Sequence, residues 1–305
     1  MRKTVSFKHN QINMAGHLYL PEGFDENKLY PAVVSVHPGG GVKEQTAGLY
    51  AAKLSDQGFV TLAFDASHQG DSGGEPRLLE DPYARVEDVR CAVDYLSALR
   101  FVDQEKIGVL GICAGGGYAV AAAQTERRIK AVATVSAIDI GAMFRGEESI
   151  ETQLQTLEAV AKQRTAEANG AEAHLLNWAP DTLEDMDEHT PVLMREAYGY
   201  YRTPRAQHPN STNRFLFTSV GKLLSFSASS QISTYLTQPM LVIVGTEADT
   251  RVYSDQFYAL SNGPKEMFLV EGATHIAMYD IPKYVGQAVT KLTDFFGQNL
   301  KNSTK

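Results

Sequence analysis

Short runs of apolar residues recur along the chain, and most are followed by a glycine-containing turn and a stretch with helical character. The runs are apolar at consecutive positions rather than at alternate ones, which is typical of strands buried on both faces of a sheet. Alternation of such strands with helices predicts a parallel sheet covered by helices. Six strands of this kind are predicted, at Pro31–Val36, Val60–Phe64, Lys106–Leu110, Ala131–Val135, Met240–Val244 and Met267–Val270.

Two further strands are predicted before these six. Thr4–Phe7 and Ile12–Leu20 can form an antiparallel pair, and the second alternates its apolar and polar positions, so we expect one wetter face and a place at the sheet edge. Helices are expected between the strands. Tyr83–Leu99 repeats valine and leucine at three- and four-residue spacing after Pro82, which predicts an amphipathic helix, and another helix is expected from Pro282.

The alternation of strands and helices stops between residues 138 and 237. This part includes the helix-forming stretch Gln153–Asn169 and three tyrosines in Arg195–Tyr201, and it contains no clear strand. Because a structureless loop of about a hundred residues is rare in a compact domain, we expect a helical insertion. The predicted organisation is one core domain made of residues 1–137 and 238–305, with a helical cap made of residues 138–237.

Composition and charge exclude several classes of binding partner and of cellular location for the protein. The 305 residues include 43% hydrophobic residues, enough for a large core, and the formal net charge is -8, with no basic run that would suit nucleic acid. The apolar runs are far shorter than the roughly 18 residues that a membrane span needs. Met1–Asn10 has no apolar signal core, and two cysteines cannot build a disulfide framework. These features predict a cytoplasmic protein that binds neither nucleic acid nor membrane.

The most informative segment is Val109–Tyr118, which reads VLGICAGGGY. An apolar strand runs into a glycine-rich turn and an alanine-rich helix, with Cys113 at the turn. Small neighbours let the strand and the helix approach closely around a strained backbone. A thiol at a helix N-terminus lies at the positive end of the helix dipole, which favours the reactive thiolate. Cys113 is therefore the candidate nucleophile, whereas Cys91 lies beside an apolar helix stripe and is expected to be a buried, inert thiol.

This segment resembles the G-x-S-x-G nucleophile elbow of the α/β-hydrolase superfamily, with cysteine in place of serine as in the dienelactone-hydrolase-like branch. The turn Phe64–Gly74 is similar to another turn of these hydrolases. The resemblance covers Val33–Ser136 and Met240–Phe296 and leaves the cap out. It implies an α/β-hydrolase fold, in which a mostly parallel eight-stranded sheet is flanked by helices.

The resemblance also implies the partners of the nucleophile, because the chain order in the superfamily is nucleophile, acid, histidine. His275, after the last predicted strand, is then the general base, and Asp249 is the acid that orients it. The spacing from Gly245 to Asp249 is one residue longer than the usual pattern. Glu247 is the alternative acid.

An oxyanion hole is implied by an earlier segment. Val36–Gly41 reads VHPGGG and resembles the HGGG-type loop of lipases and esterases, with a proline inserted after the histidine. The backbone N–H of Gly39 or Gly40, together with that of Ala114, would hold the charge of a tetrahedral intermediate. This segment is not a phosphate-binding loop, because Gly41 is not followed by a lysine and then a serine or threonine.

The predicted function is hydrolysis of an ester-type bond (a carboxylic ester, a thioester or a lactone) through a Cys-His-Asp triad and an acyl-thioenzyme. One alternative is an acyltransferase that uses the same triad, and another is a non-catalytic ligand-binding protein on the same scaffold. The expected partner is a small acyl substrate chosen by the cap, with a homodimer as the oligomeric option. No cofactor is implied, and no metal, because the histidines show no ligand spacing such as H-x-x-x-H.

Overall fold

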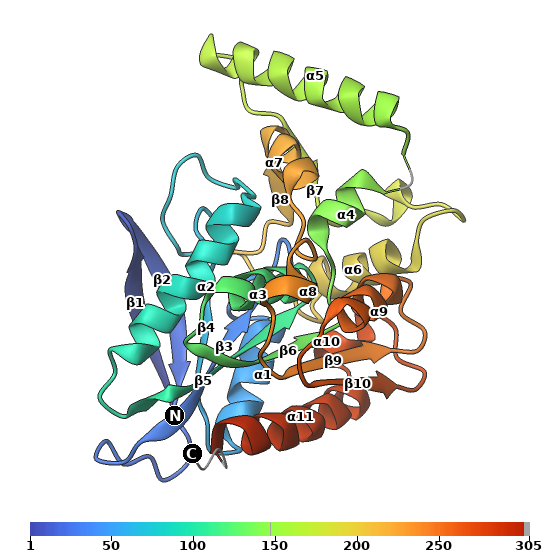
Figure 1. The fold of residues 1–305 in the computed structure, drawn as a ribbon. Helices are drawn as coiled ribbons and strands as arrows, with labels where there is room; N and C mark the ends of the chain where they lie inside the picture. The colour runs from blue at the N-terminus through green and yellow to red at the C-terminus, as the bar shows by residue number, and fades with distance from the viewer. Residues whose placement is uncertain (147, 302–305) are drawn as a thin grey trace.

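The computed structural model describes residues 1–146 and 148–301 of the chain. Its centre is a sheet of eight strands in the order β1-β2-β4-β3-β5-β6-β9-β10 (Figure 1). The pairs β1–β2 and β2–β4 are antiparallel, and the other five pairs are parallel. The strands are β1 (Arg2–His9), β2 (Ile12–Tyr19), β3 (Tyr30–Val36), β4 (Val60–Phe64), β5 (Val102–Ile112), β6 (Ile129–Val135), β9 (Met240–Gly245) and β10 (Lys265–Val270).

All eight predicted strands are confirmed, and so is the antiparallel pair at the edge of the sheet. The central strands are buried along most of their length because helices cover both faces. Strand β5 is longer than predicted, since Val102 also pairs with Tyr30 across an irregularity in the ladder.

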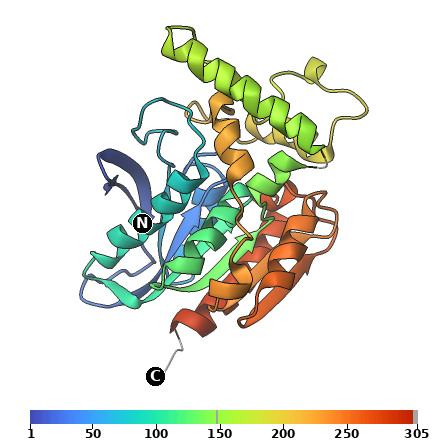
Figure 2. The same ribbon diagram turned by 45° about the horizontal axis from the view of Figure 1, so that its top comes forward.

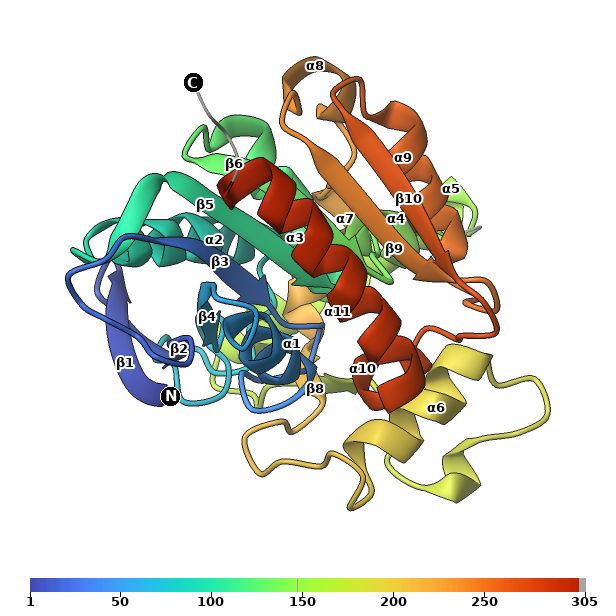
Figure 3. The ribbon, with the colours of Figure 1, turned by 90° about the horizontal axis from the view of Figure 1, so that it is seen from below.

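Helices lie on both sides of the sheet. Figure 3 shows α1 and α11 together on one face, while α2, α3, α8 and α9 pack on the other. A short helix, α10, precedes α11 and lies beside α1. The bounds are α1 (Thr46–Ser55), α2 (Pro82–Ser97), α3 (Ala114–Thr125), α8 (Ile232–Tyr235), α9 (Arg251–Leu260), α10 (Ala277–Asp280) and α11 (Pro282–Phe296), which continues into η3 (Gly297–Lys301).

Capping residues explain where several helices begin. Helix α2 starts at Pro82 because the Asp81 carboxylate accepts hydrogen bonds from the backbone N–H groups of Tyr83 and Ala84. Helix α3 is different, because its N-cap is Cys113, whose side chain makes no cap hydrogen bond. The N–H of Ala114, the first residue of α3, hydrogen bonds to the thiol instead.

Most of residues 138–237, which we call the cap, lies beyond the carboxyl ends of the strands (Figures 1 and 2), while its last helix, α8, packs against α3 and α9 on one face of the sheet. The cap was expected to be helical without strands, but it also contains a two-stranded antiparallel sheet of three residues a side. These strands are too short to give an alternating pattern that the sequence could reveal. The elements are α4 (Ile140–Arg145), α5 (Ile150–Ala168), β7 (Leu175–Asn177), η1 (Leu183–Asp185), α6 (Val192–Tyr201), β8 (Arg214–Leu216), η2 (Phe217–Ser219) and α7 (Val220–Ser225), followed by α8.

Polar contacts fasten the cap to the core. The Arg205 guanidinium binds the Asp280 carboxylate through two hydrogen bonds of 2.8 and 2.5 Å. The Ser211 hydroxyl donates a hydrogen bond of 2.6 Å to the carbonyl oxygen of Gly40. The cap therefore holds the glycine loop after β3 from outside. Within the part of the chain that is described, no helix has the length and apolar character to cross a membrane.

Candidate active site

Cys113 occupies the sharp turn between β5 and α3. Its backbone has φ +57° and ψ −126°, in the left-handed region that side chains rarely adopt and that is common at functional turns. The turn depends on neighbours without side chains. A Cβ atom on Gly111 would lie 2.2 Å from the carbonyl oxygen of Gly115, and one on Gly115 would lie 2.4 Å from that of Val36. Close packing of β3, β5 and α3 thus requires these glycines.

Three hydrogen-bond donors surround the thiol of Cys113. Burial raises the pKa of this thiol above its ordinary value, while the Tyr279 hydroxyl and the backbone N–H groups of Ala114 and Gly39 act in the opposite direction by hydrogen bonding to the sulfur. The two N–H groups come from different segments and meet at one atom. An oxyanion hole needs its donors near the oxygen that develops next to the nucleophile. Gly39 and Ala114, which the sequence predicts for that role, both have their N–H groups next to the sulfur.

Gly40, the other predicted oxyanion residue, has a different place. Its φ is +70°, and a Cβ atom there would lie 2.7 Å from Cδ1 of Trp178 in the cap. Gly40 therefore shapes the loop and lets the indole ring lie against it, while the neighbouring Gly39 presents its N–H to the thiol.

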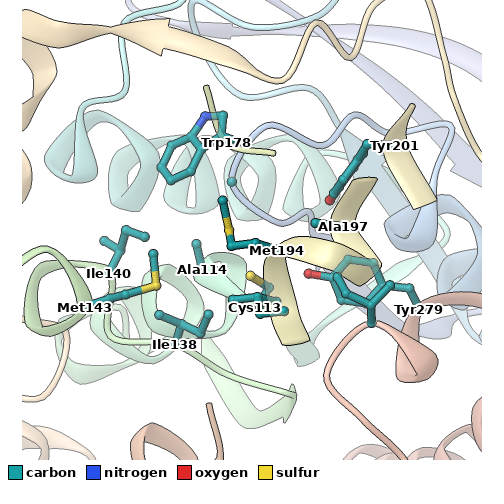
Figure 4. A pocket seen from close by; sticks show the side chains of 13 residues that line it. Cys113, Ala114, Ile138, Ile140, Met143, Trp178, Met194, Ala197, Tyr201 and Tyr279 are labelled. Atoms are coloured by element: carbon teal, nitrogen blue, oxygen red, sulfur yellow. The ribbon is translucent and has the colours of Figure 1, made fainter. Parts of the chain in front are cut away.

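His275 is completely buried and lies next to two hydroxyl groups. Its Nε2 is 3.1 Å from the Tyr279 hydroxyl oxygen, and its Nδ1 is 2.5 Å from Oγ1 of Thr250. Because burial disfavours the charged ring, the pKa of His275 is lowered to about 3. The side chains form a chain from sulfur through the Tyr279 hydroxyl and the imidazole to Thr250 (Figure 4 shows the Tyr279 hydroxyl directed at Cys113).

The structure does not bring Asp249 to His275. The Asp249 carboxylate is exposed and accepts a hydrogen bond of 3.0 Å from the backbone N–H of Leu193, at the start of α6. Glu247, the alternative acid, is also exposed and contacts the Thr246 hydroxyl at 3.4 Å. The next residue after Asp249, Thr250, is the one that turns inward. In this structure the expected contact between acid and histidine is replaced by a contact between hydroxyl and histidine.

A buried ionic group lies behind the oxyanion loop. Arg85 is 3% exposed, and its guanidinium donates a hydrogen bond of 2.8 Å to the carbonyl oxygen of His37, two residues before Gly39. Glu80 balances its charge at 3.7 Å and accepts a hydrogen bond of 2.6 Å from the Tyr118 hydroxyl. This group fixes the start of the loop that carries the Gly39 N–H.

A pocket opens over the thiol, with about 470 Å³ of empty space that is partly continuous with solvent. Three apolar side chains lie on one side of Cys113 in Figure 4, and Tyr201 and Tyr279 lie on the other. The apolar side chains are Ile138, Ile140 and Met143. Core and cap both contribute to the wall. The lining residues are Gly39, Cys113, Ala114, Ile138, Ile140, Met143, Trp178, Leu193, Met194, Ala197, Tyr201, Ile276 and Tyr279.

The second cysteine lies away from this pocket. Cys91 is 7% exposed within the apolar core, and burial raises its pKa to about 12. His68, in the turn after β4, bonds the carbonyl oxygen of Pro76 at 3.0 Å and does not line the pocket. In residues 1–146 and 148–301, no three His, Cys, Asp or Glu side chains gather as a metal ion would need.

Sequence reasoning missed two residues of the site, Tyr279 and Thr250. Tyr279 follows His275 by four residues, a spacing that lets both side chains meet on one side of a turn. The loop after His275 gave no strong helical pattern, so the spacing alone did not single it out. Thr250 was missed because the superfamily order directs attention to carboxylates.

Comparison with known proteins shows the family of the chain. A model of the alpha/beta hydrolase family matches residues 33–288. The chain is 42% identical to YcjY of Escherichia coli (strain K12), over 98% of this chain and 100% of that protein. It superimposes on the crystal structure of PA2218 from Pseudomonas aeruginosa with a TM-score of 0.89 and 33% identity, covering 98% of this chain and 94% of the other. It is also 28% identical to the acyltransferase drtE of Aspergillus calidoustus, over 88% of this chain and 87% of that protein. The chain therefore belongs to the alpha/beta hydrolase family and has its fold.

Proposed function

We propose that this protein hydrolyses ester-type bonds and that Cys113 is the nucleophile. The observation that carries the proposal is the meeting of two backbone N–H groups, from Gly39 and Ala114, at a thiol held in a left-handed turn on the floor of a pocket. A merely structural cysteine has no need of such donors. A nucleophile whose substrate develops an oxyanion beside it does need them.

The first step is attack on the substrate carbonyl. The thiol gives its proton to the Tyr279 oxygen as the Tyr279 hydroxyl proton passes to Nε2 of His275, so that thiolate and imidazolium form together. Sulfur bonds to the carbonyl carbon, and the N–H groups of Gly39 and Ala114 hold the oxyanion. The leaving group takes the proton from the imidazolium as its bond breaks, leaving an acyl-thioenzyme.

His275 acts in this scheme with Thr250 in the position expected for Asp249. A threonine hydroxyl can accept from Nδ1–H and thereby fix the tautomer in which Nε2 is free. It carries no charge, however, and stabilises the imidazolium less than a carboxylate does. The low pKa of His275 fits this setting, since burial lowers it and no anion restores it. The imidazolium is therefore short-lived, and proton transfer from the thiol to His275 occurs together with attack on the carbonyl carbon.

The pocket favours an apolar acyl group. Ile138, Ile140 and Met143 form the side of the pocket away from His275, while the leaving group has to lie near the imidazole that protonates it. The substrate is therefore a small ester, thioester or lactone whose acyl part is apolar. Nothing in the proposed steps needs a metal or a cofactor.

A second candidate function is acyl transfer through the same intermediate. The similarity to the acyltransferase drtE favours it. Transfer and hydrolysis differ only in whether an alcohol or thiol, or water, releases the acyl group. Adding an acceptor alcohol and measuring ester against free acid separates the two.

Mass spectrometry of the intact protein tests the proposal. After incubation with a short acyl p-nitrophenyl ester or a short acyl thioester, we expect a mass increase of one acyl group, located at Cys113 by peptide mapping. Cys113→Ala should form no adduct and show no turnover, while Cys91→Ala serves as the control and should behave as the wild type. Turnover that survives in Cys113→Ala would falsify the nucleophile assignment, and an unreactive wild type would favour the non-catalytic alternative.

A further inference from the structure

One hydroxyl in the pocket wall, that of Tyr201, makes no well-formed hydrogen bond to the described residues. The Tyr201 side chain, on α6 of the cap, is 6% exposed, and its buried hydroxyl makes no hydrogen bond of normal geometry to any described residue. The hydroxyl beside it is that of Tyr279, which acts to lower the pKa of Tyr201 against the larger effect of burial. Leaving a buried polar group unpaired costs free energy, so such a group in a binding pocket points to a ligand. The neighbouring Tyr279 hydroxyl is already engaged with His275 and the thiol.

The direction of this hydroxyl distinguishes it from the other unpaired group of the pocket. Trp178 Nε1 also lacks a partner among the described residues, but Figure 4 shows the nitrogen on the side of the ring away from Cys113. The Tyr201 hydroxyl points toward the space between Cys113 and Tyr279. Burial raises the pKa of Tyr201 well above its ordinary value, so the group keeps its proton and can both donate and accept.

Tyr201 also stands between two hollows. Besides the pocket over the thiol, it lines a second hollow on the cap, whose other residues are mostly polar. Tyr201 is thus the one residue that lines both the pocket over the thiol and this polar hollow. The other residues of the second hollow are Arg202, Gln207, His208, Pro209, Ser211 and Thr212.

The side of the pocket on which Tyr201 lies matters for the chemistry. The nucleophile that releases an acyl group must approach where the first leaving group departed, next to His275. Tyr201 and Tyr279 lie on that side, opposite Ile138 and Met143. We propose that Tyr201 binds the hydroxyl nucleophile, water or a small alcohol, that releases the acyl group from Cys113. This inference rests on the proposed acyl-thioenzyme.

The step balances without a further reactant. The oxygen of the nucleophile, held by the Tyr201 hydroxyl, bonds to the thioester carbonyl carbon while its proton passes to His275. The tetrahedral intermediate, held by Gly39 and Ala114, collapses with cleavage of the carbon–sulfur bond. Sulfur takes the proton back from His275, and the free thiol and a carboxylic acid, or an ester when the nucleophile is an alcohol, are formed.

Separate measurement of the two half-reactions tests this role. With a p-nitrophenyl acyl ester, the burst of p-nitrophenol reports acylation, and the steady rate reports release. In Tyr201→Phe we expect the burst rate to stay within about twofold of the wild type and the release rate to fall about tenfold, the effect of losing one neutral hydrogen bond. The acyl adduct on Cys113 should accumulate in the mass spectrum. Hydroxylamine, which attacks thioesters without assistance, should restore release, and methanol should be used less well by the variant than by the wild type.

The control is Tyr198→Phe, because Tyr198 lies on the same helix and does not line the pocket. Melting temperatures of both variants should match the wild type, because Tyr201→Phe removes a hydroxyl that makes no hydrogen bond of normal geometry and Tyr279 keeps its bond to His275. Equal release rates in Tyr201→Phe and wild type, or an equal loss of burst and release, would overturn the role of Tyr201 while leaving the acyl-enzyme intact. Absence of any adduct in the wild type would instead overturn the proposed function, and this inference with it.

Discussion

At the scale of single residues, the site combines a predicted pair with an unpredicted connection. Cys113 and His275 were expected from their places in the chain, and both lie at the site. In the proposed mechanism the proton path between them runs through Tyr279, which contacts both. A phenol between sulfur and imidazole lowers the pKa of the thiol by donating to it, against the larger effect of burial. The free enzyme should therefore rest as neutral thiol and neutral imidazole.

This resting state gives a pH profile for alkylation. Because burial raises the pKa of Cys113 above its ordinary value, the thiolate fraction is small at pH 7 and grows about tenfold per pH unit. We expect the rate of reaction with iodoacetamide to climb beyond pH 9, with no plateau near pH 5 from an ion pair. In Tyr279→Phe the curve should move to higher pH, because the thiolate loses a donor. Tyr200→Phe, next to Tyr279, is the matched control, and a curve unchanged in Tyr279→Phe counts against the path.

A second prediction compares Thr250 with Asp249. Thr250→Val removes the hydroxyl that fixes the tautomer of His275, and we expect kcat/KM to fall about tenfold or more. Asp249→Asn should change kcat/KM less than threefold, since the carboxylate contacts a helix N–H rather than the imidazole. Initial rates with one p-nitrophenyl ester measure both. The opposite ranking would mean that Asp249 turns toward His275 in the working enzyme.

The sequence could not show which residue of this loop points its side chain at His275, because that depends on the local path of the backbone. Spacing after a strand can say that an acid lies in a loop, but a shift of one residue decides which side chain points inward. Here the extra residue between Gly245 and Asp249 exposes Asp249 and buries Thr250. The positions of Gly39 and Ala114 are easier to predict, because it is their backbone N–H groups that face the thiol, and every residue except proline carries such a group.

At the scale of secondary-structure elements, the core strands and the helical character of the cap could be predicted, but the short strands of the cap could not. Continuous apolar runs mark strands of a buried parallel sheet, and all of them were found. In the cap, β7 and β8 have three residues each, too few for a period, and they are held by pairing across about forty residues of chain. The elbow is the element on which both fold and site depend, because β5 and α3 pack through glycines.

Glycine substitutions measure this packing. Gly115→Ala puts a Cβ atom 2.4 Å from a backbone carbonyl oxygen, so we expect the free energy of unfolding to fall by about 3 kcal/mol and the activity to be lost. A Cβ atom at Gly286, in α11, would have no neighbour within 4 Å, so Gly286→Ala should raise the free energy of unfolding by about 0.5–1 kcal/mol. Urea denaturation of the two variants gives both values. A tolerated Gly115→Ala would mean that the elbow can open without cost.

At the scale of the whole molecule, the pocket exists only where core and cap meet. The core supplies the thiol, the imidazole and the two backbone N–H groups proposed to hold the oxyanion, and the cap supplies the apolar side and Tyr201. Because the proposed reacting groups lie in the core and the apolar wall lies in the cap, the cap can determine which substrate binds without changing the reaction. Substitutions in the cap should therefore change which acyl group is preferred, more than they change the reaction itself.

Met143, in α4 of the cap, offers a direct test because it lies on the apolar side of the pocket. Met143→Ala removes three heavy atoms from this wall, so acyl chains longer by about two carbons should fit in the space. Each added methylene that becomes buried is worth about 0.8 kcal/mol, or roughly fourfold in kcat/KM. Rates with p-nitrophenyl esters from acetate to octanoate should thus shift their optimum to longer chains, while the acetate rate changes little. Met186→Ala, a cap methionine outside the pocket, should keep the wild-type optimum. An unchanged optimum in Met143→Ala would place the acyl group on the tyrosine side instead, and the nucleophile that releases it on the side of Met143.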